Sequence, residues 1–222
     1  MKNKENITNK SKLFLKKHQA FLLFILLMSV FRSAIADWYN IPSSSMMPTI
    51  EIGDRITVNK MAYDLRIPFT STSIVRMNEP KRGEIVVFNS KAANKRLIKR
   101  IIALPGDSVS MEREFLTING KKASYKTLSH TSGHLLRETI NEISQVVTID
   151  STKLTPLNRF SNVTVPKDHY LVLGDNRQNS ADSRVYGFVP REELLGNANH
   201  VAFSLDYNNY YIPRTNRVFK HL

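Results

Sequence analysis

Short stretches with the two-residue alternation of β-strands make up most of the chain beyond its N-terminal region. Residues 55–63, RITVNKMAY, alternate apolar and polar side chains over their first half. Residues 83–90, GEIVVFNS, are rich in β-branched side chains and are bounded by turn residues. We expect further strands at 96–104, 169–176 and 198–206. The pattern therefore predicts a mainly β protein.

Turn signals separate these strands. The residues Pro-Gly-Asp at 105–107 end one strand, and Asn-Gly at 119–120 supplies the positive φ that a tight hairpin turn needs. Beyond residue 40 no stretch has the length and period of a long amphipathic helix, and residues 190–196, PREELLG, indicate only a short helical turn. We predict a curled antiparallel sheet, or a partly closed barrel, behind one N-terminal helix.

The N-terminal region carries an apolar run behind a lysine-rich segment. Residues 20–31, AFLLFILLMSVF, run for about 12 residues without a charge, fewer than the ~20 that cross a bilayer. Arg32 ends the run. A segment extended from Ala20 to Trp38 is nearly long enough to cross a bilayer if the Arg32 side chain reaches the membrane interface. Three interpretations stay open: a membrane anchor, an interfacial helix, or a signal peptide cut near the small residues at 34–36. We expect the residues beyond 38 to lie outside the cytoplasm, because lysines precede the run.

Composition narrows the range of partners. The chain has a net charge of +13, a pI near 10.0 and no cysteine, so disulfides and thiolate metal sites are excluded. A basic cluster at 81–100 lacks interleaved aromatic residues, and we therefore expect no nucleic-acid partner. His130 and His134, the one pair of histidines four residues apart, have no carboxylate at ligand spacing. We expect neither a metal nor a cofactor.

Candidate chemistry starts at residues 41–50, IPSSSMMPTI, where apolar residues that a solvated linker does not need flank three serines. A neutral lysine can activate a serine, but a free lysine has a pKa of about 10.4 and is charged at pH 7. Burial lowers that pKa by up to ~3–5 units. Lys99 shares a strand face with Leu97 and Ile101 and is a candidate base, whereas Arg100 stays protonated. The alternative that the Lys99 side chain simply reaches water stays open.

Four motifs follow one another along the chain. They are IPSSSMMPTIEIGDRITVNKMAY at 41–63, KRGEIVVF at 81–88, RLIKRIIALPGDSV at 96–109 and LVLGDNRQNSADSRVYGFVP at 171–190. In their order and surroundings the chain resembles the bacterial type I signal peptidases, membrane-bound enzymes that use a serine and a lysine to remove signal peptides from exported proteins. The resemblance runs from about Arg32 to about Leu205, with a gap at 121–165. It implies that the hydrophobic N-terminus is kept as a membrane helix.

The resemblance implies separate roles for the three serines. Ser45 matches the nucleophile of the family. Ser43 matches the serine whose hydroxyl forms the oxyanion hole together with the backbone N–H of Ser45. The family usually has Gly or Ala where this chain has Ser44, so this residue is expected to act only as a spacer. Met46 and Met47 are expected to line the site or to face the membrane.

The resemblance also assigns the residues that support catalysis. Lys99 matches the general base, and Ser180 matches a serine that hydrogen-bonds and orients the lysine amine. Asp182 and Arg184 match an ion pair that braces the loop. The implied substrate is an extended preprotein segment that adds as a strand to a sheet edge. The family's Ala-x-Ala preference implies shallow apolar pockets that admit small side chains at the first and third positions before the cut.

The implied protein is a single-pass enzyme of the cytoplasmic membrane, with a cytoplasmic N-terminus and an extracytoplasmic catalytic domain. Its expected partners are exported preproteins and membrane lipid, and no oligomer is implied. The expected parts are a basic segment at 1–19, an anchor at 20–38, a catalytic β core at 39–120 and 166–207, an inserted β subdomain at 121–165, and a C-terminal tail at 208–222.

Two alternatives compete with this interpretation. The first is a Ser-Lys protease that matures a single exported substrate, as conjugation-associated proteases do. LexA-like repressors share the dyad and a related sheet, but they need a DNA-binding helix-turn-helix that this N-terminus cannot supply. The second alternative is a catalytically silent, anchored β module that binds exported peptides.

Overall fold

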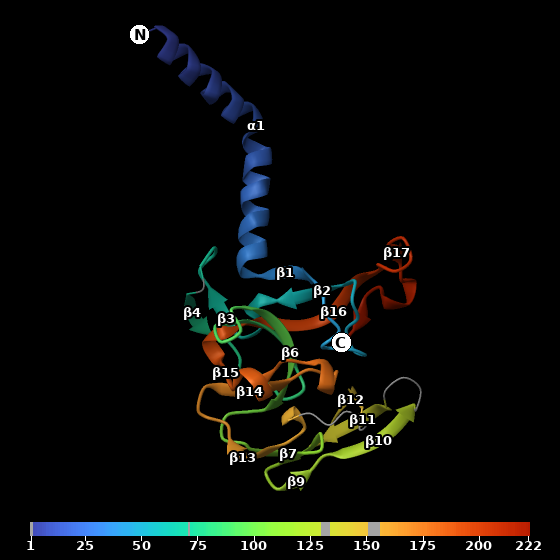
Figure 1. Ribbon diagram of the computed structural model, residues 1–222. Helices are drawn as coiled ribbons and strands as arrows, with labels where there is room; N and C mark the ends of the chain where they lie inside the picture. Colours follow the sequence, from blue (N-terminus) through green and yellow to red (C-terminus); the bar gives the residue numbers. More distant parts are fainter. Residues whose placement is uncertain (1, 71, 130–133, 151–155) are drawn as a thin grey trace.

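The computed structural model describes residues 2–70, 72–129, 134–150 and 156–222. A long helix, α1 (Lys2–Ala34), projects from a body built of β-strands and joins that body at β1 (Figure 1). The prediction of a mainly β protein is confirmed.

The largest sheet of the described residues has nine strands, and all its strand pairs are antiparallel. Its strands lie in the order β1-β2-β16-β5-β6-β14-β15, and β17 and β18 pair with β16. They are β1 (Ala36–Asn40), β2 (Asp54–Asn59), β5 (Ile85–Ser90), β6 (Lys95–Ala103), β14 (His169–Leu173), β15 (Val189–Pro190), β16 (Leu194–Asp206), β17 (Ile212–Pro213) and β18 (Lys220–His221).

Of the two predicted forms, a curled antiparallel sheet or a partly closed barrel, the structure shows an antiparallel sheet that does not close into a barrel. Closure needs the two edge strands of a sheet to pair with each other, and β1 and β15 remain the two ends of the path. Strand β15 contains only two residues, and β1 continues directly from α1. Among the described residues no sheet closes on itself, so the main sheet keeps free edges.

Three smaller sheets complete the body. They contain β3 (Asp64–Arg66) with β4 (Ser73–Arg76); β13 (Phe160–Thr164), β7 (Ser108–Glu112), β8 (Phe115–Ile118) and β9 (Lys121–Lys122); and β10 (Ser124–Ser129), β11 (His134–Ile140) and β12 (Ile143–Ile149). The described part of the expected insertion at 121–165 supplies β10–β12 and also β13, which pairs with β7. This segment is therefore joined to the core through a shared sheet.

The hairpin between β8 and β9 turns where the sequence predicts it. Asn119 and Gly120 have φ angles of 51° and 75°, the left-handed pair that a tight turn requires. Arg113 and Glu114 between β7 and β8 adopt the same conformation, with φ of 49° and 73°. Neither is a residue type that signals such a turn, so this second hairpin was not predicted.

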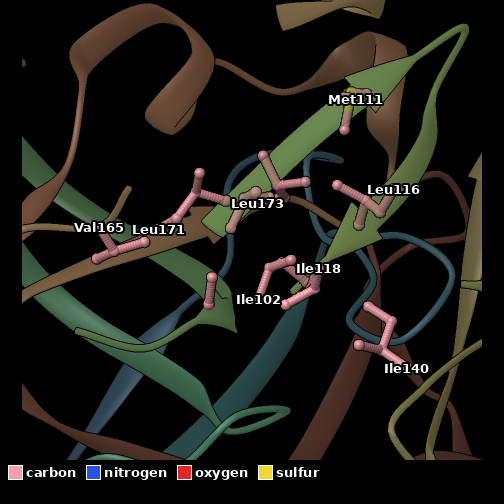
Figure 2. Packing of buried hydrophobic residues seen from close by; sticks show 10 residues of the cluster. Ile102, Met111, Leu116, Ile118, Ile140, Val165, Leu171 and Leu173 are labelled. Carbon is pink, nitrogen blue, oxygen red and sulfur yellow. The ribbon is translucent and has the colours of Figure 1, made fainter. Parts of the chain in front are cut away.

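Apolar residues on both faces of the main sheet form the core. Along β5, Ile85 and Val87 pack into one buried cluster and Val86 and Phe88 into another, as alternation along a buried strand requires. A third cluster joins the main sheet to the β7–β8 sheet (Figure 2). Its labelled members are Ile102, Met111, Leu116, Ile118, Ile140, Val165, Leu171 and Leu173.

Helix α1 ends at Ala34, before the expected end of the membrane segment at Trp38. The chain leaves the helix there because residues 36–40 pair with β2, and the Lys60 ammonium donates to the Arg32 carbonyl at 2.8 Å. The other helical segments are short: α2 (Ser183–Tyr186) and the 3₁₀ turns η1 (Lys60–Ala62), η2 (Pro156–Asn158), η3 (Arg177–Asn179), η4 (Arg191–Glu193) and η5 (Thr215–Arg217).

In the part of the chain that the structure describes, none of the helices combines the length and the apolar character that crossing a membrane requires.

The C-terminal residues 208–222 are mostly exposed and are tied to the main sheet through β17, β18 and the buried Arg217. Arg217, only 4% exposed, donates to Asp54, which is fully buried, through Nε at 2.9 Å and Nη2 at 2.5 Å. It also donates to the Glu51 carboxylate at 2.8 Å and to the Thr49 carbonyl at 3.1 Å. Burial alone would raise the pKa of Asp54, but the Arg217 hydrogen bonds and the Glu51 N–H lower it below its usual value. The segment 49–54 is therefore fixed by a residue from the end of the chain.

We expect Arg217→Ala to lower the free energy of unfolding by about 3–5 kcal/mol, because it leaves the Asp54 carboxylate buried and unpaired. Urea denaturation measures this change. Lys91→Ala breaks the exposed pair between Lys91 and Glu192 and serves as the control, with no measurable loss expected. Equal effects of the two substitutions would show that the buried pair does not hold the C-terminus.

Candidate active site

The serine cluster lies in the turn between β1 and β2. Backbone hydrogen bonds shape this turn: Met47 N donates to the Ser44 carbonyl and Ile50 N to the Met46 carbonyl, each at 3.0 Å. Met46 and Ile50 are buried in the apolar cluster beneath it, whereas Met47 is exposed. The turn is therefore anchored by its apolar residues, as the poor fit of "IPSSSMMPTI" to a linker suggested.

Lys99 lies in the middle of β6, and its side chain is only 3% exposed. Its Nζ lies 2.7 Å from Ser45 Oγ, within hydrogen-bonding distance. The alternative that Lys99 reaches water is therefore excluded. Two residues separated by more than fifty positions in the sequence meet here because β6 runs directly beneath the serine turn.

Burial lowers the pKa of Lys99 from its ordinary value of 10.5 to about 8. Within this value of about 8, the Asp182 and Asp175 charges raise the pKa and the Lys95 and Arg184 charges lower it, and burial is the largest effect. At a pKa of about 8, about one amine in ten is neutral at pH 7, compared with about one in 2,500 for free lysine. A substantial fraction of the Lys99 amine is therefore neutral at pH 7 and able to accept a proton.

Ser43 and Ser45 open onto one cleft. Their hydroxyl oxygens are 3.5 Å apart, at the outer limit of a hydrogen bond. The cleft has a volume of about 310 Å³ and runs between residues 39–46 and residues 96–99. A substrate carbonyl placed over Ser45 from this cleft would lie close to the Ser43 hydroxyl.

Ser180 lies in the loop after β14 and is 5% exposed. Its Oγ has no hydrogen-bond partner among the described residues, so the expected bond to the Lys99 amine is not formed here. Gly174 makes room for it: a Cβ at this position would lie 2.2 Å from Ser180 Oγ and 2.5 Å from the Ser45 carbonyl oxygen. Any larger residue at 174 would push Ser180 and the serine turn apart.

Asp182 and Arg184 form the expected ion pair. Arg184 donates to Asp182 through Nε at 2.9 Å and Nη2 at 2.8 Å, and Gly174 N donates to the same carboxylate at 3.0 Å. Burial alone would raise the pKa of Asp182, but the hydrogen bonds and charge of Arg184 lower it below its usual value. Arg184 also donates to Glu114 at 3.3 Å and so links this loop to the β7–β8 hairpin.

Two asparagines of the same loop, which the sequence did not single out, hold the serine turn. Asn179 Nδ2 donates to Ser44 Oγ at 2.7 Å, and Asn176 Nδ2 donates to the Ser44 carbonyl at 3.1 Å. The Asn176 backbone N–H donates to the Ser45 carbonyl at 3.1 Å. Ser44 is therefore more than a spacer. The available signal was the concentration of polar residues in GDNRQNS, which does not reveal their partners.

Two further buried ion pairs flank this loop. Arg100 makes a two-pronged contact with Asp175 at 2.9 and 2.7 Å, and Thr49 Oγ1 donates to Asp175 at 2.5 Å. Arg177 pairs with Glu138 of β11, and both side chains are completely enclosed. The polar pairs connect the loop at 174–184 to β6, to the serine turn and to the insertion. All of these partners lie far away in the sequence.

No group of three or more potential metal ligands comes together within the described ranges of the chain. His130 lies outside those residues, and of His134 only the backbone in β11 is described.

The family described as "Signal peptidase, peptidase S26" matches residues 14–203. The chain belongs to this family. Members of the S26 family are signal peptidases, hydrolases that remove signal peptides from exported preproteins, and the family is associated with membranes.

Relatives of this S26 member cover most of its length. Signal peptidase I of Pseudomonas aeruginosa is 32% identical, over 86% of this chain and 72% of the relative. Signal peptidase I of Buchnera aphidicola from Schizaphis graminum is 32% identical over 92% of this chain and 79% of the relative. Signal peptidase I P of Bacillus subtilis natto is 31% identical over 90% of this chain and 94% of the relative. A crystal structure of a signal peptidase I from Enterococcus faecalis is 31% identical, covers 55% of this chain and 97% of its own, and has a TM-score of 0.36.

We expect Ser44→Ala and Asn179→Ala each to lower the free energy of unfolding of this S26 member by about 0.5–1.5 kcal/mol, because each removes one hydrogen bond. Thermal or urea denaturation measures the loss. The double variant serves as the control: if the two residues act through one bond, it is little worse than either single variant. Additive losses would mean that the Ser44 hydroxyl and the Asn179 amide contribute independently.

Proposed function

We propose that this S26 member is a membrane-bound serine endopeptidase that removes N-terminal signal peptides from exported preproteins, with Ser45 as the nucleophile and Lys99 as the general base. The observation that carries the proposal is the 2.7 Å separation between Lys99 Nζ and Ser45 Oγ at a buried position. A serine and a neutral lysine in hydrogen-bond contact form the minimal unit for attack on a peptide carbonyl. Membership of the S26 family supports the choice of substrate.

In the first half of the reaction, neutral Lys99 takes the proton of the Ser45 hydroxyl, and Ser45 Oγ attacks the carbonyl carbon of the scissile bond. The Ser45 backbone N–H and the Ser43 hydroxyl stabilise the oxyanion that forms. Loss of one such donor typically costs about 10²–10³ in rate. Protonated Lys99 then donates to the leaving amine, which departs with the mature protein.

In the second half, the signal peptide remains attached to Ser45 as an ester. Lys99, neutral again, deprotonates a water that attacks this ester, and the proton returns to Ser45 as the peptide leaves. Asp182 and Arg184 brace the loop that carries Ser180. The Ser180 hydroxyl has no partner among the described residues, and we propose that it orients the Lys99 amine only when substrate is bound. The 2.8 Å contact between Arg184 and Asp182 supports the bracing role that we give to this ion pair.

The substrate docks along a free edge of the main sheet. Strand β6 pairs with β5 over residues 95–100, but β14 pairs with its other edge only from Arg100 onward. Among the described residues, no strand covers that edge over residues 95–99. Residues 96–99 of this edge also line the cleft at Ser45. An extended peptide can add here as a strand. The apolar side chains of Ile41, Met46 and Ile98 line the same cleft and favour small residues at the first and third positions before the cut.

We also propose that α1 holds the enzyme in the cytoplasmic membrane in a single pass. Large apolar side chains along the apolar run of α1, among them Phe21 and Leu27, are exposed on the isolated chain. Arg32 stacks over Trp38 at 4.4 Å, and this combination suits a membrane interface. The lysines before the run place the N-terminus in the cytoplasm and the β body outside it. The division of the chain set out above is part of this proposal.

The test is cleavage of a model preprotein in detergent. Ser45→Ala and Lys99→Met are each expected to lower kcat/KM by at least about 10³-fold, because each removes one half of the dyad. Ser110→Ala in β7 and Lys91→Met on the surface are matched controls that should cleave normally. Near wild-type cleavage by either dyad variant would contradict the proposal.

Two rival functions give different results in the same assay. A silent binding module would leave every preprotein intact and form no ester on Ser45, which mass spectrometry detects. A protease dedicated to one substrate would cleave a single member of a panel of preproteins. A general signal peptidase is expected to cleave most of them.

A further inference from the structure

The cleft at Ser45 ends in an aromatic and cationic pair. The guanidinium carbon of Arg96 lies 4.5 Å from the centre of the Tyr39 ring, and Arg96 Nε donates to Asn89 Oδ1 at 3.1 Å. The stacking and the hydrogen bond fix the plane of the guanidinium. Both residues line the same cleft as Ser45 and Lys99.

The two residues come from opposite walls of the cleft. Tyr39 belongs to β1, shortly before the serine turn, and Arg96 belongs to β6, three positions before Lys99. At about 3.3 Å per residue, Arg96 lies about 10 Å along the strand from the base. A peptide that pairs with the free edge of β6, with its scissile carbonyl at Ser45, therefore brings a residue three or four positions from that carbonyl alongside Arg96.

The charges at this end of the cleft favour an anionic side chain of a bound peptide. Arg96 has neither an ion pair nor a partner for its Nη groups among the residues that the structure describes, and its neighbour Lys95 is exposed. The nearby carboxylate, Asp37, already pairs with Arg32 at 2.8 Å and with Lys60 at 3.2 Å. The Arg96 charge is therefore not compensated by any carboxylate of the described residues, and its Nη donors are available to a bound peptide.

The upstream side of the substrate enters at this end. Helix α1 leads into β1 (Figure 1). Tyr39 belongs to β1 and lines the cleft, so this wall connects to the proposed anchor. A signal peptide lies in the membrane on the N-terminal side of the cut, and its last residues must approach Ser45 from that direction. Beyond Arg100 the edge of β6 is covered by β14, which directs the mature segment away from the sheet.

We propose that Arg96, held flat on Tyr39, is a specificity-determining residue that favours an acidic over a basic side chain at the fourth or fifth position before the cut. This inference rests on the proposed function. The small residues at the first and third positions fill the apolar part of the cleft, and Arg96 contacts the next side chain upstream. A lysine there meets an uncompensated guanidinium, whereas an aspartate forms a charge-assisted hydrogen bond with it.

The test compares three model preproteins that differ only in having Asp, Asn or Lys at these upstream positions. The wild-type enzyme is expected to cleave the Asp substrate with a kcat/KM about 3- to 10-fold above that of the Lys substrate, the range of a partly exposed charge contact. Arg96→Gln should bring the ratio to about one, and Arg96→Glu should invert it. Arg96→Lys should keep part of the preference.

Lys122→Glu in β9 is the matched control, because it makes the same change from a positive to a negative charge on an exposed strand away from the cleft. It should leave the Asp-to-Lys ratio at the wild-type value. Raising the salt concentration from 50 to 500 mM should shrink the wild-type ratio, since the contact is partly exposed. Far-ultraviolet circular dichroism checks that each variant is folded.

Two results would overturn the proposal. One is an Arg96→Glu enzyme that keeps the wild-type order of substrates. The other is an Arg96→Gln enzyme that loses activity equally on all three, which would make Arg96 only a support of the cleft wall. Cleavage of the uncharged Asn substrate by the wild-type enzyme reports on the proposed function itself, so the two claims fail separately.

Discussion

The contact between the Lys99 amine and the Ser45 hydroxyl is the interaction on which the rest of the site depends. The pKa of Lys99 is about 8 in place of 10.5, so protonating Lys99 in the folded protein costs roughly 3 kcal/mol more than protonating it in the unfolded chain. Between pH 8 and pH 10.5 Lys99 is mostly protonated in the unfolded chain and mostly neutral in the folded protein. Its contribution to the free energy of unfolding therefore becomes more favourable to the folded state as the pH rises across this range. The cost of protonation arises because Lys99 lies in the middle of β6, where neighbouring segments exclude water from its side chain.

Keeping the amine neutral requires that nearby carboxylates are already paired. Asp175 and Asp182 would stabilise the ammonium form of Lys99, and each is held by an arginine, Arg100 and Arg184 respectively. The arginines offset those negative charges, so that burial remains the dominant effect on Lys99. The same ion pairs fix the loop at 174–184, whose asparagines hold the serine turn. The same contacts therefore influence both the position of Ser45 and the charge state of Lys99.

Features encoded over a few residues could be predicted from the sequence. Alternation and β-branched residues located β5 and β6, and Asn119-Gly120 located its hairpin, because each depends on adjacent residues. Features that depend on distant segments could not. Alternation along β6 left the burial of Lys99 open, since the residues that cover it come from the serine turn and from the loop after β14. For the same reason the sequence left open the choice between a curled sheet and a partly closed barrel, and it did not predict the Ser44–Asn179 bond or the packing of Arg217 on Asp54.

The most direct test of the account is a titration of the Lys99 side chain by NMR in the intact, folded enzyme, labelled with ¹³C at the lysine ε-carbons and assigned with Lys99→Met. We expect the Lys99 signal to titrate near pH 8, well before the signals of the exposed lysines. A Lys99 amine that stays protonated above about pH 10, like an ordinary lysine, would contradict the claim that this site holds a neutral base.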